Sequence, residues 1–183
     1  MAEDALAGWD GARVKAIVPH IERVLAAGGL TGSELAVARA RVTQALLNVV
    51  QDDRGRWVLG PHPEQRSELR LTAVQGARIR RLALDRTFVT TEGERWIVDY
   101  KAGMHEGADA EAFLDSEQER YRGQLETYAE ALDPGARLGL YFPLVPGWRQ
   151  WSSPPLSHEE GTGAASGSAD IIRDGGPPRT EVP

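Results

Sequence analysis

The sequence predicts an α/β fold in which N-terminal helices precede three antiparallel strands, a long helix and a further parallel strand. Apolar residues recur every three to four positions over residues 10–27 and 31–50, as in amphipathic helices. Short strand-like runs then follow between residues 67 and 101. A long helical pattern over 111–132 leads into an apolar run at 137–142. Because a helix connects this run to the strands before it, we expect it to be parallel to one of them.

The two N-terminal helices are predicted from their apolar stripes and end signals. The stripe of the first helix consists of Val14, Ile17, Val18, Ile21, Val24 and Leu25. Pro19 should kink this helix, and Gly28 with Gly29 should end it. The run Thr31-Gly32-Ser33-Glu34 matches a capping box, which predicts that a second helix begins there and extends to about Val50.

A turn at residues 52–55 and a short apolar piece at 56–59 are expected before the strands. His62 lies between two prolines and is expected to be exposed, without a chemical role. The strands are predicted at 67–73, 77–89 and 95–101. Gly93 suits the positive-φ position of the short loop between the last two.

The third strand ends in charge, since Asp99 and Lys101 follow an aromatic and β-branched run and share one face. Lys101 is one of only two lysines among the 21 basic residues, and the others are arginine. A compact ammonium is therefore rare in this chain and is found at the end of this strand. If the hairpin loop centres on Glu92, Asp85 faces Asp99 with their Cβ atoms roughly 5 Å apart. Two carboxylates at that distance repel by roughly 3 kcal/mol at an effective dielectric constant of 20. The pattern therefore predicts a divalent cation between them, with a protonated carboxylate as the alternative.

Gln124 and Tyr128 are four residues apart and share a face of the long predicted helix. They either lean over the carboxylate pair or are a core aromatic and its polar neighbour. The loop at 102–110 is expected to be mobile, with a solvated His105. Residues 152–183 are rich in Pro, Gly and Ser and predict a disordered tail.

Composition limits the class of protein. The 183 residues are 41% apolar, which is enough for one core. The net charge of −6 argues against general binding of a nucleic-acid backbone, yet residues 66–101 hold eight basic and five acidic residues and could bind phosphates locally. The lack of cysteine excludes disulfides and zinc–thiolate or iron–sulfur sites. Without a long apolar run or a signal peptide, we expect no membrane association and a cytoplasmic location.

The spacing of Asp85, Asp99-Tyr100-Lys101 and Gln124-x-x-x-Tyr128 resembles the PD-(D/E)XK nuclease core, the restriction-endonuclease-like fold. It resembles more closely the C-terminal exonuclease domain of RecB/AddA-type, UvrD-like helicase–nucleases. The resemblance covers about residues 56–151. It implies a nuclease core at 56–151, with a helical segment at 1–55 packed on it and the tail at 152–183.

The resemblance implies that Asp85 and Asp99 bind Mg²⁺, for which Mn²⁺ can substitute, and that the carbonyl of Tyr100 is a further ligand. Glu68 would act through the water shell of the metal. Lys101 would orient or deprotonate the attacking water and stabilise charge on the phosphate.

The same resemblance implies that Gln124 and Tyr128 position the lysine or the scissile strand. The implied reaction is hydrolysis of a DNA phosphodiester in recombinational repair, with a UvrD-like helicase as partner in cis or in trans.

The chain departs from this family at several points. A metal-binding histidine on the family's first helix has no counterpart among His20 and His62, so we expect that this helix lay upstream of Met1 and that the chain is a fragment. Leu82 stands where the family often has glycine, and Ala102 where it often has threonine. No P-loop motif is present, so this chain carries no ATPase motor of its own.

Three functions stay open. The first is a Mg²⁺-dependent DNA exonuclease domain. The second is a nuclease-like module that no longer cuts and only grips DNA ends or docks on a helicase. The third is a small-molecule enzyme that uses a carboxylate–lysine pair, which would require a deep apolar pocket.

Overall fold

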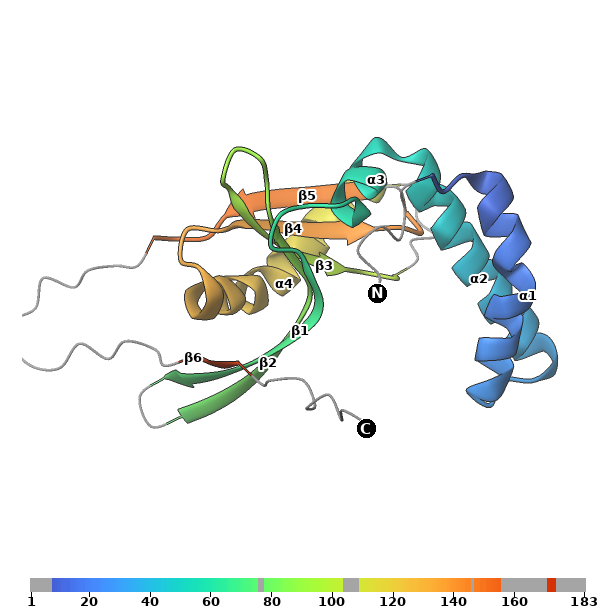
Figure 1. The fold of residues 1–183 in the computed structure, drawn as a ribbon, viewed down its shortest axis with the longest axis horizontal. Helices are drawn as coiled ribbons and strands as arrows, with labels where there is room; N and C mark the ends of the chain where they lie inside the picture. Colours follow the sequence, from blue (N-terminus) through green and yellow to red (C-terminus); the bar gives the residue numbers. More distant parts are fainter. Residues whose placement is uncertain (1–7, 76–77, 104–108, 146, 156–170, 174–183) are drawn as a thin grey trace, which may run out of the picture.

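The computed structural model describes residues 8–75, 78–103, 109–145, 147–155 and 171–173 (Figure 1). The helices are α1 (Gly11–Ala27), α2 (Gly32–Gln51), α3 (Asp53–Leu59) and α4 (Ala110–Leu132). The strands are β1 (Arg66–Gln75), β2 (Arg78–Val89), β3 (Arg95–Tyr100), β4 (Arg137–Phe142), β5 (Gly147–Ser152) and β6 (Ile171–Arg173). None of the helices in these ranges is both long and apolar enough to cross a bilayer.

One mixed sheet forms the centre, with strand order β5-β4-β3-β2-β1-β6. The strands β1, β2 and β3 are antiparallel neighbours. The helix α4 then connects β3 to β4, which is parallel to β3. The predicted α/β class and its order of three antiparallel strands, a crossover helix and a parallel strand are thus confirmed.

Helices cover both faces of the sheet. Ile97 faces α4 and packs with Leu125 of that helix and Leu140 of β4. Its neighbours Trp96 and Val98 point to the other face, because side chains alternate along a strand. There they pack with apolar residues of α3, β2 and β4 and with the end of α2. The face that carries α4 is called the α4 face below.

The α1–α2 helical hairpin projects from the sheet (Figure 1). It joins the core through the C-terminal end of α2, where Val49 is buried and the Asn48 amide donates to the Pro143 carbonyl at 2.7 Å. The predicted stripe of α1 is only partly buried, since Val24 is exposed. The expected capping box does not form, because the Thr31 side chain makes no capping hydrogen bond.

The predicted turn at 52–55 is wrong, because Asp53–Leu59 forms the helix α3; the short apolar piece at 56–59 is the C-terminal part of this helix. The Asp52 carboxylate starts it by accepting hydrogen bonds from the Arg54 and Gly55 amides, at 3.2 and 3.0 Å. Gly55 packs so closely that a side chain there would collide with the Tyr141 hydroxyl. His62 is half-buried and stacks on Phe88 with ring centroids 4.0 Å apart, so its expected exposure is also wrong.

The predicted disorder of residues 152–183 is wrong at both of its described parts. Ser152 ends β5 and Ser153 is buried, and Ile171–Arg173 forms β6 and pairs with β1. Residues 156–170 and 174–183 of that predicted tail lie outside the described residues. The pattern also gave no prediction of β5, which pairs antiparallel with β4 and forms the other edge of the sheet.

Candidate functional site

The register of β2 and β3 sets the two predicted acids opposite each other. Arg86 pairs with Val98 and Thr87 with Ile97, so the next level of the same register brings Asp85 opposite Asp99. The regular ladder stops at this level, and the Tyr100 amide donates instead to Asp85 Oδ2 at 2.9 Å. The register from Arg86–Val98 to Val89–Arg95 agrees with the hairpin loop that the sequence predicts, and Gly93 has the expected positive φ of 86°.

Glu68 lies at the same level on β1. Its neighbours Ser67 and Leu69 pair with Arg86 and Leu84, so Glu68 faces Asp85 across the β1–β2 register. Its φ of 52° interrupts the regular pairing there. The three acids therefore form a row across three strands. They do not converge on one point, since the described residues contain no group of three or more His, Asp or Glu side chains placed to hold one metal ion.

The interruption of the β1–β2 pairing at Glu68 and Asp85 also changes which face of the sheet the side chains of β2 point to. Leu84 packs in the cluster that includes α4, whereas Phe88, four residues on, packs in the cluster on the other face. Strict alternation would place both on one face. Figure 1 shows the β1–β2 hairpin curving away from the rest of the sheet.

Lys101 Nζ lies 2.7 Å from Asp99 Oδ2, and the two side chains are 16% and 7% exposed. The contact is an ion pair by distance, and within the described residues Oδ2 accepts no other hydrogen bond. Burial raises the pKa of the Asp99 carboxyl above its ordinary value, the Lys101 ammonium opposes that rise, and the Asp85 carboxylate adds to it. The site thus holds a carboxylate whose negative charge is only partly compensated by the protein.

The ammonium of Lys101 also lies over the ring of Tyr121 on α4, with Nζ 3.4 Å from the ring centroid. The ring and the carboxylate of Asp99 together fix the position of the ammonium. The sequence alone did not indicate this role for Tyr121. Its spacing of three residues from Gln124 puts it on the same helix face and was the available signal.

Gln124 Nε2 donates to the Tyr128 hydroxyl at 2.7 Å, and Tyr128 is buried in the core beneath α4. Within the described residues, no hydrogen bond joins either side chain to Asp85, Asp99 or Lys101. The structure thus bears out the alternative in which Tyr128 is a core aromatic and Gln124 its polar neighbour. A positioning role for the two residues stays a prediction.

Tyr100 contributes through its main chain, whose amide holds Asp85. Its side chain packs against the cluster that contains Trp96 and Val98, on the face away from α4, which agrees with the alternation of β3. The predicted metal ligand at this residue is the carbonyl oxygen, so the direction of the ring has no bearing on it.

A buried arginine next to Asp85 holds β2 in place. The Arg86 guanidinium donates to the carbonyls of Val58 and Gly60, both at 2.7 Å. It donates as well to the side chains of Ser67, at 3.1 Å, and Gln65, at 2.8 Å. Burial lowers the pKa of Arg86, and the neighbouring Tyr100 opposes this. Arg86, the residue after Asp85, therefore connects β2 to β1 and to the C-terminal end of α3. The sequence alone did not indicate this role.

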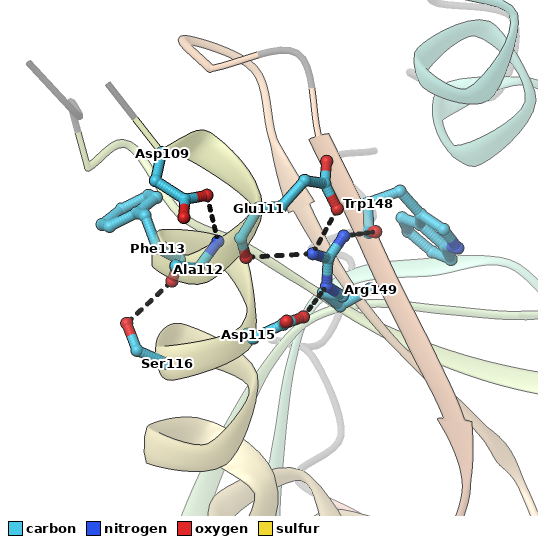
Figure 2. A network of polar contacts seen from close by, with 8 residues as sticks. All are labelled: Asp109, Glu111, Ala112, Phe113, Asp115, Ser116, Trp148 and Arg149. Atoms are coloured by element: carbon cyan, nitrogen blue, oxygen red, sulfur yellow. Dashed lines mark hydrogen bonds and ion pairs between the residues drawn. The ribbon is translucent and has the colours of Figure 1, made fainter. Parts of the chain in front are cut away.

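A second arginine fixes the N-terminal end of α4 against β5 (Figure 2). Arg149 donates to Asp115 Oδ1 and Glu111 Oε2, both at 2.7 Å, and to the Glu111 carbonyl at 3.1 Å. Burial by itself would lower the pKa of Arg149, and the bonds to Asp115 and Glu111 together raise it. The Asp109 carboxylate caps the same end by accepting from the Ala112 amide at 2.9 Å. These contacts set the position of α4 above Asp99 and Lys101.

The predicted mobile loop and His105 lie mostly outside the described residues, because residues 104–108 are not described. No protein-family model matches the chain. No curated protein matches it significantly either.

Proposed function

We propose that this chain is a Mg²⁺-dependent DNA exonuclease domain with a PD-(D/E)XK core, from a helicase–nuclease of recombinational repair. The observation that carries the proposal is the register of β2 and β3, which sets Asp85 opposite Asp99 and pairs Asp99 with Lys101 on one face. The sheet order supports the same fold, because a crossover helix follows three antiparallel strands and leads into a strand parallel to β3.

The donor set at this place fits a hard divalent cation. Carboxylate and carbonyl oxygens are the ligands that Mg²⁺ prefers in proteins. Asp85 and Asp99 supply the carboxylates, and the Tyr100 carbonyl supplies a neutral oxygen. Burial raises the pKa of Asp99 and so favours its neutral form, and a bound cation would stabilise the ionised carboxylate. When bound, Mg²⁺ supplies Lewis-acid stabilisation of negative charge on the phosphate.

Lys101 has a defined part in the proposed reaction. Water attacks phosphorus and gives up a proton to the surrounding water as the new P–O bond forms. The ester bond to the leaving oxygen breaks, and that oxygen takes up a proton from the surrounding water. An ammonium has three donors and no acceptor, so Lys101 in its ion pair orients the water and stabilises charge on the phosphate, and it does not take the proton. Glu68, in the same row, would hold ordered water at the edge of the site.

The test is degradation of linear DNA with Mg²⁺ or Mn²⁺ by the wild type, Asp99→Ala and Lys101→Ala. Glu119→Ala is a matched control, since this acid belongs to an exposed ion pair on α4. We expect metal-dependent loss of DNA in the wild type and the control, and none in the two site variants. DNA binding without cutting in all four proteins would instead favour the nuclease-like module that only grips DNA.

A further inference from the structure

The β1–β2 hairpin carries arginines without acidic partners. Arg70, Arg80 and Arg81 are exposed, and no ion pair or hydrogen bond engages their guanidinium groups within the described residues. Elsewhere the chain pairs exposed and half-buried arginines with carboxylates, as for Arg39, Arg95, Arg120, Arg122 and Arg149. Arg70, Arg80 and Arg81 thus form a group of exposed arginines that no carboxylate neutralises within the described residues.

Two hollows meet at Arg70. The first, of about 530 Å³, extends to the C-terminal end of α4 and contains Arg95, which is neutralised by Glu64 and Asp133. The second, of about 450 Å³, lies on the hairpin itself, between Arg70 and Arg81. Its lining, as far as the described residues go, contains no acid: Arg70, Leu71, Thr72, Arg81, Leu82 and Ala83. The second hollow thus has uncompensated positive charge.

The strand register places both of its cations on one face of the hairpin. Arg70 pairs with Ala83 and Thr72 with Arg81, so the two arginines are diagonal neighbours. Diagonal positions are roughly 7–8 Å apart, within reach of one extended anionic chain. Leu71 and Leu82 pair with each other on the opposite face, where they join the core. The core packing therefore holds the arginine face outward.

We propose that Arg70 and Arg81 bind the phosphate backbone of a DNA strand at this hairpin, outside the acid row. This inference rests on the proposed nuclease function and adds a substrate contact to it. The planar guanidinium of arginine matches the oxygens of a phosphate and can donate two hydrogen bonds to them at once. The hydroxyl of Thr72, between the two arginines, adds a donor. Arg81 is four residues from Asp85 on β2, or about 13 Å along the strand.

The whole chain has a net charge of −6, so binding of DNA phosphates has to come from a local positive patch. Only a few arginines then contribute to the affinity. Removing two phosphate contacts should therefore have a large effect. For single strands each contact contributes about 0.7 to the slope of log K against log salt concentration. Loss of both contacts should lower that slope by about 1.4.

The experiment measures the Kd of fluorescein-labelled oligo(dT) by anisotropy in EDTA, over a series of NaCl concentrations, with the full chain. The test variant is Arg70→Gln/Arg81→Gln. The matched control is Arg13→Gln/Arg23→Gln, which removes the same charge from exposed arginines of α1. Arg70→Lys/Arg81→Lys keeps the charge and should keep the slope. We expect at least a tenfold higher Kd for the test variant and no more than a twofold change for the control.

Equal Kd values and slopes for the test variant and the control would overturn the inference, as would failure of the wild type to bind oligo(dT). The inference would also be overturned if the test variant bound DNA like the wild type but lost binding to phosphatidylserine vesicles. The arginines would then belong to a membrane-binding surface. Because the assay needs no cutting, it separates the two proposals. A chain that binds DNA through the hairpin and does not cut supports this inference and contradicts the nuclease activity.

Discussion

Lys101 Nζ lies 3.4 Å from the centroid of the Tyr121 ring and 2.7 Å from Asp99 Oδ2. The lysine comes from the residue directly after β3, and the tyrosine comes from the middle of α4. The ammonium is therefore held between a charge on the sheet and a ring on the helix. If it acts on a water or a phosphate, its position depends on both.

Replacement of Tyr121 tests that dependence. A desolvated cation–π contact contributes about 1 to 2 kcal/mol. If Lys101 must be held in place for hydrolysis, Tyr121→Leu should lower kcat about 5- to 30-fold. Tyr121→Phe keeps the ring and should stay within about twofold of the wild type. The measurement is single-turnover cleavage of a labelled oligonucleotide. Equal losses in both variants would show that the hydroxyl, and not the ring face, is what matters.

Asp99→Asn should stabilise the protein in the absence of metal. Since the pKa of Asp99 is raised in the folded state with Lys101 present, the folded protein prefers the neutral side chain. The wild type therefore loses stability as the pH rises from the unfolded pKa, about 3.9, through the folded pKa. In urea unfolding with EDTA, the variant should be more stable at pH 7, and the difference should disappear below pH of about 3.5. A variant less stable than the wild type at pH 7 would contradict this.

Mg²⁺ should reverse that order. A ligand that binds only the folded state at ten times its Kd adds about 1.4 kcal/mol of stability. For a chain of this size, that corresponds to an increase in Tm of about 3 to 6 °C. We expect the increase for the wild type and not for Asp99→Asn or Asp85→Asn, measured by differential scanning fluorimetry. An equal increase in all three proteins would place any bound cation elsewhere.

Arg86→Met should destabilise the fold by about 3 kcal/mol or more. The substitution leaves the carbonyls of Val58 and Gly60 buried without their donors, and each unsatisfied group costs about 1 to 3 kcal/mol. Arg120→Met is the control. Arg120 belongs to an exposed ion pair and is 69% exposed, so its loss should change the free energy of unfolding by no more than about 0.5 kcal/mol. Urea unfolding at neutral pH measures both. A small effect of Arg86→Met would show that water replaces the guanidinium.

The sequence by itself determined the elements whose signals are local. The period of two along β3 puts Asp99 and Lys101 on one face, and the loop length with Gly93 sets Asp85 opposite Asp99. Both follow from the geometry of a hairpin, which depends on neighbouring residues alone. The spacing of apolar residues over 111–132 and the end of that pattern likewise predicted a helix that leads to a parallel strand.

Only the tertiary structure decided the features that depend on distant partners. The helix α3 replaces a predicted turn because Gly55 packs under Tyr141, and β6 forms because β1 offers a free edge. Arg86 is buried because carbonyls from α3 and the loop after it accept its hydrogen bonds. Tyr121 reaches Lys101 because Arg149 fixes α4 on β5. A spacing such as that of Tyr121 and Gln124 indicates the shared helix face but not the partner, since each of these contacts joins residues that meet only once the sheet and its two layers of helices are assembled.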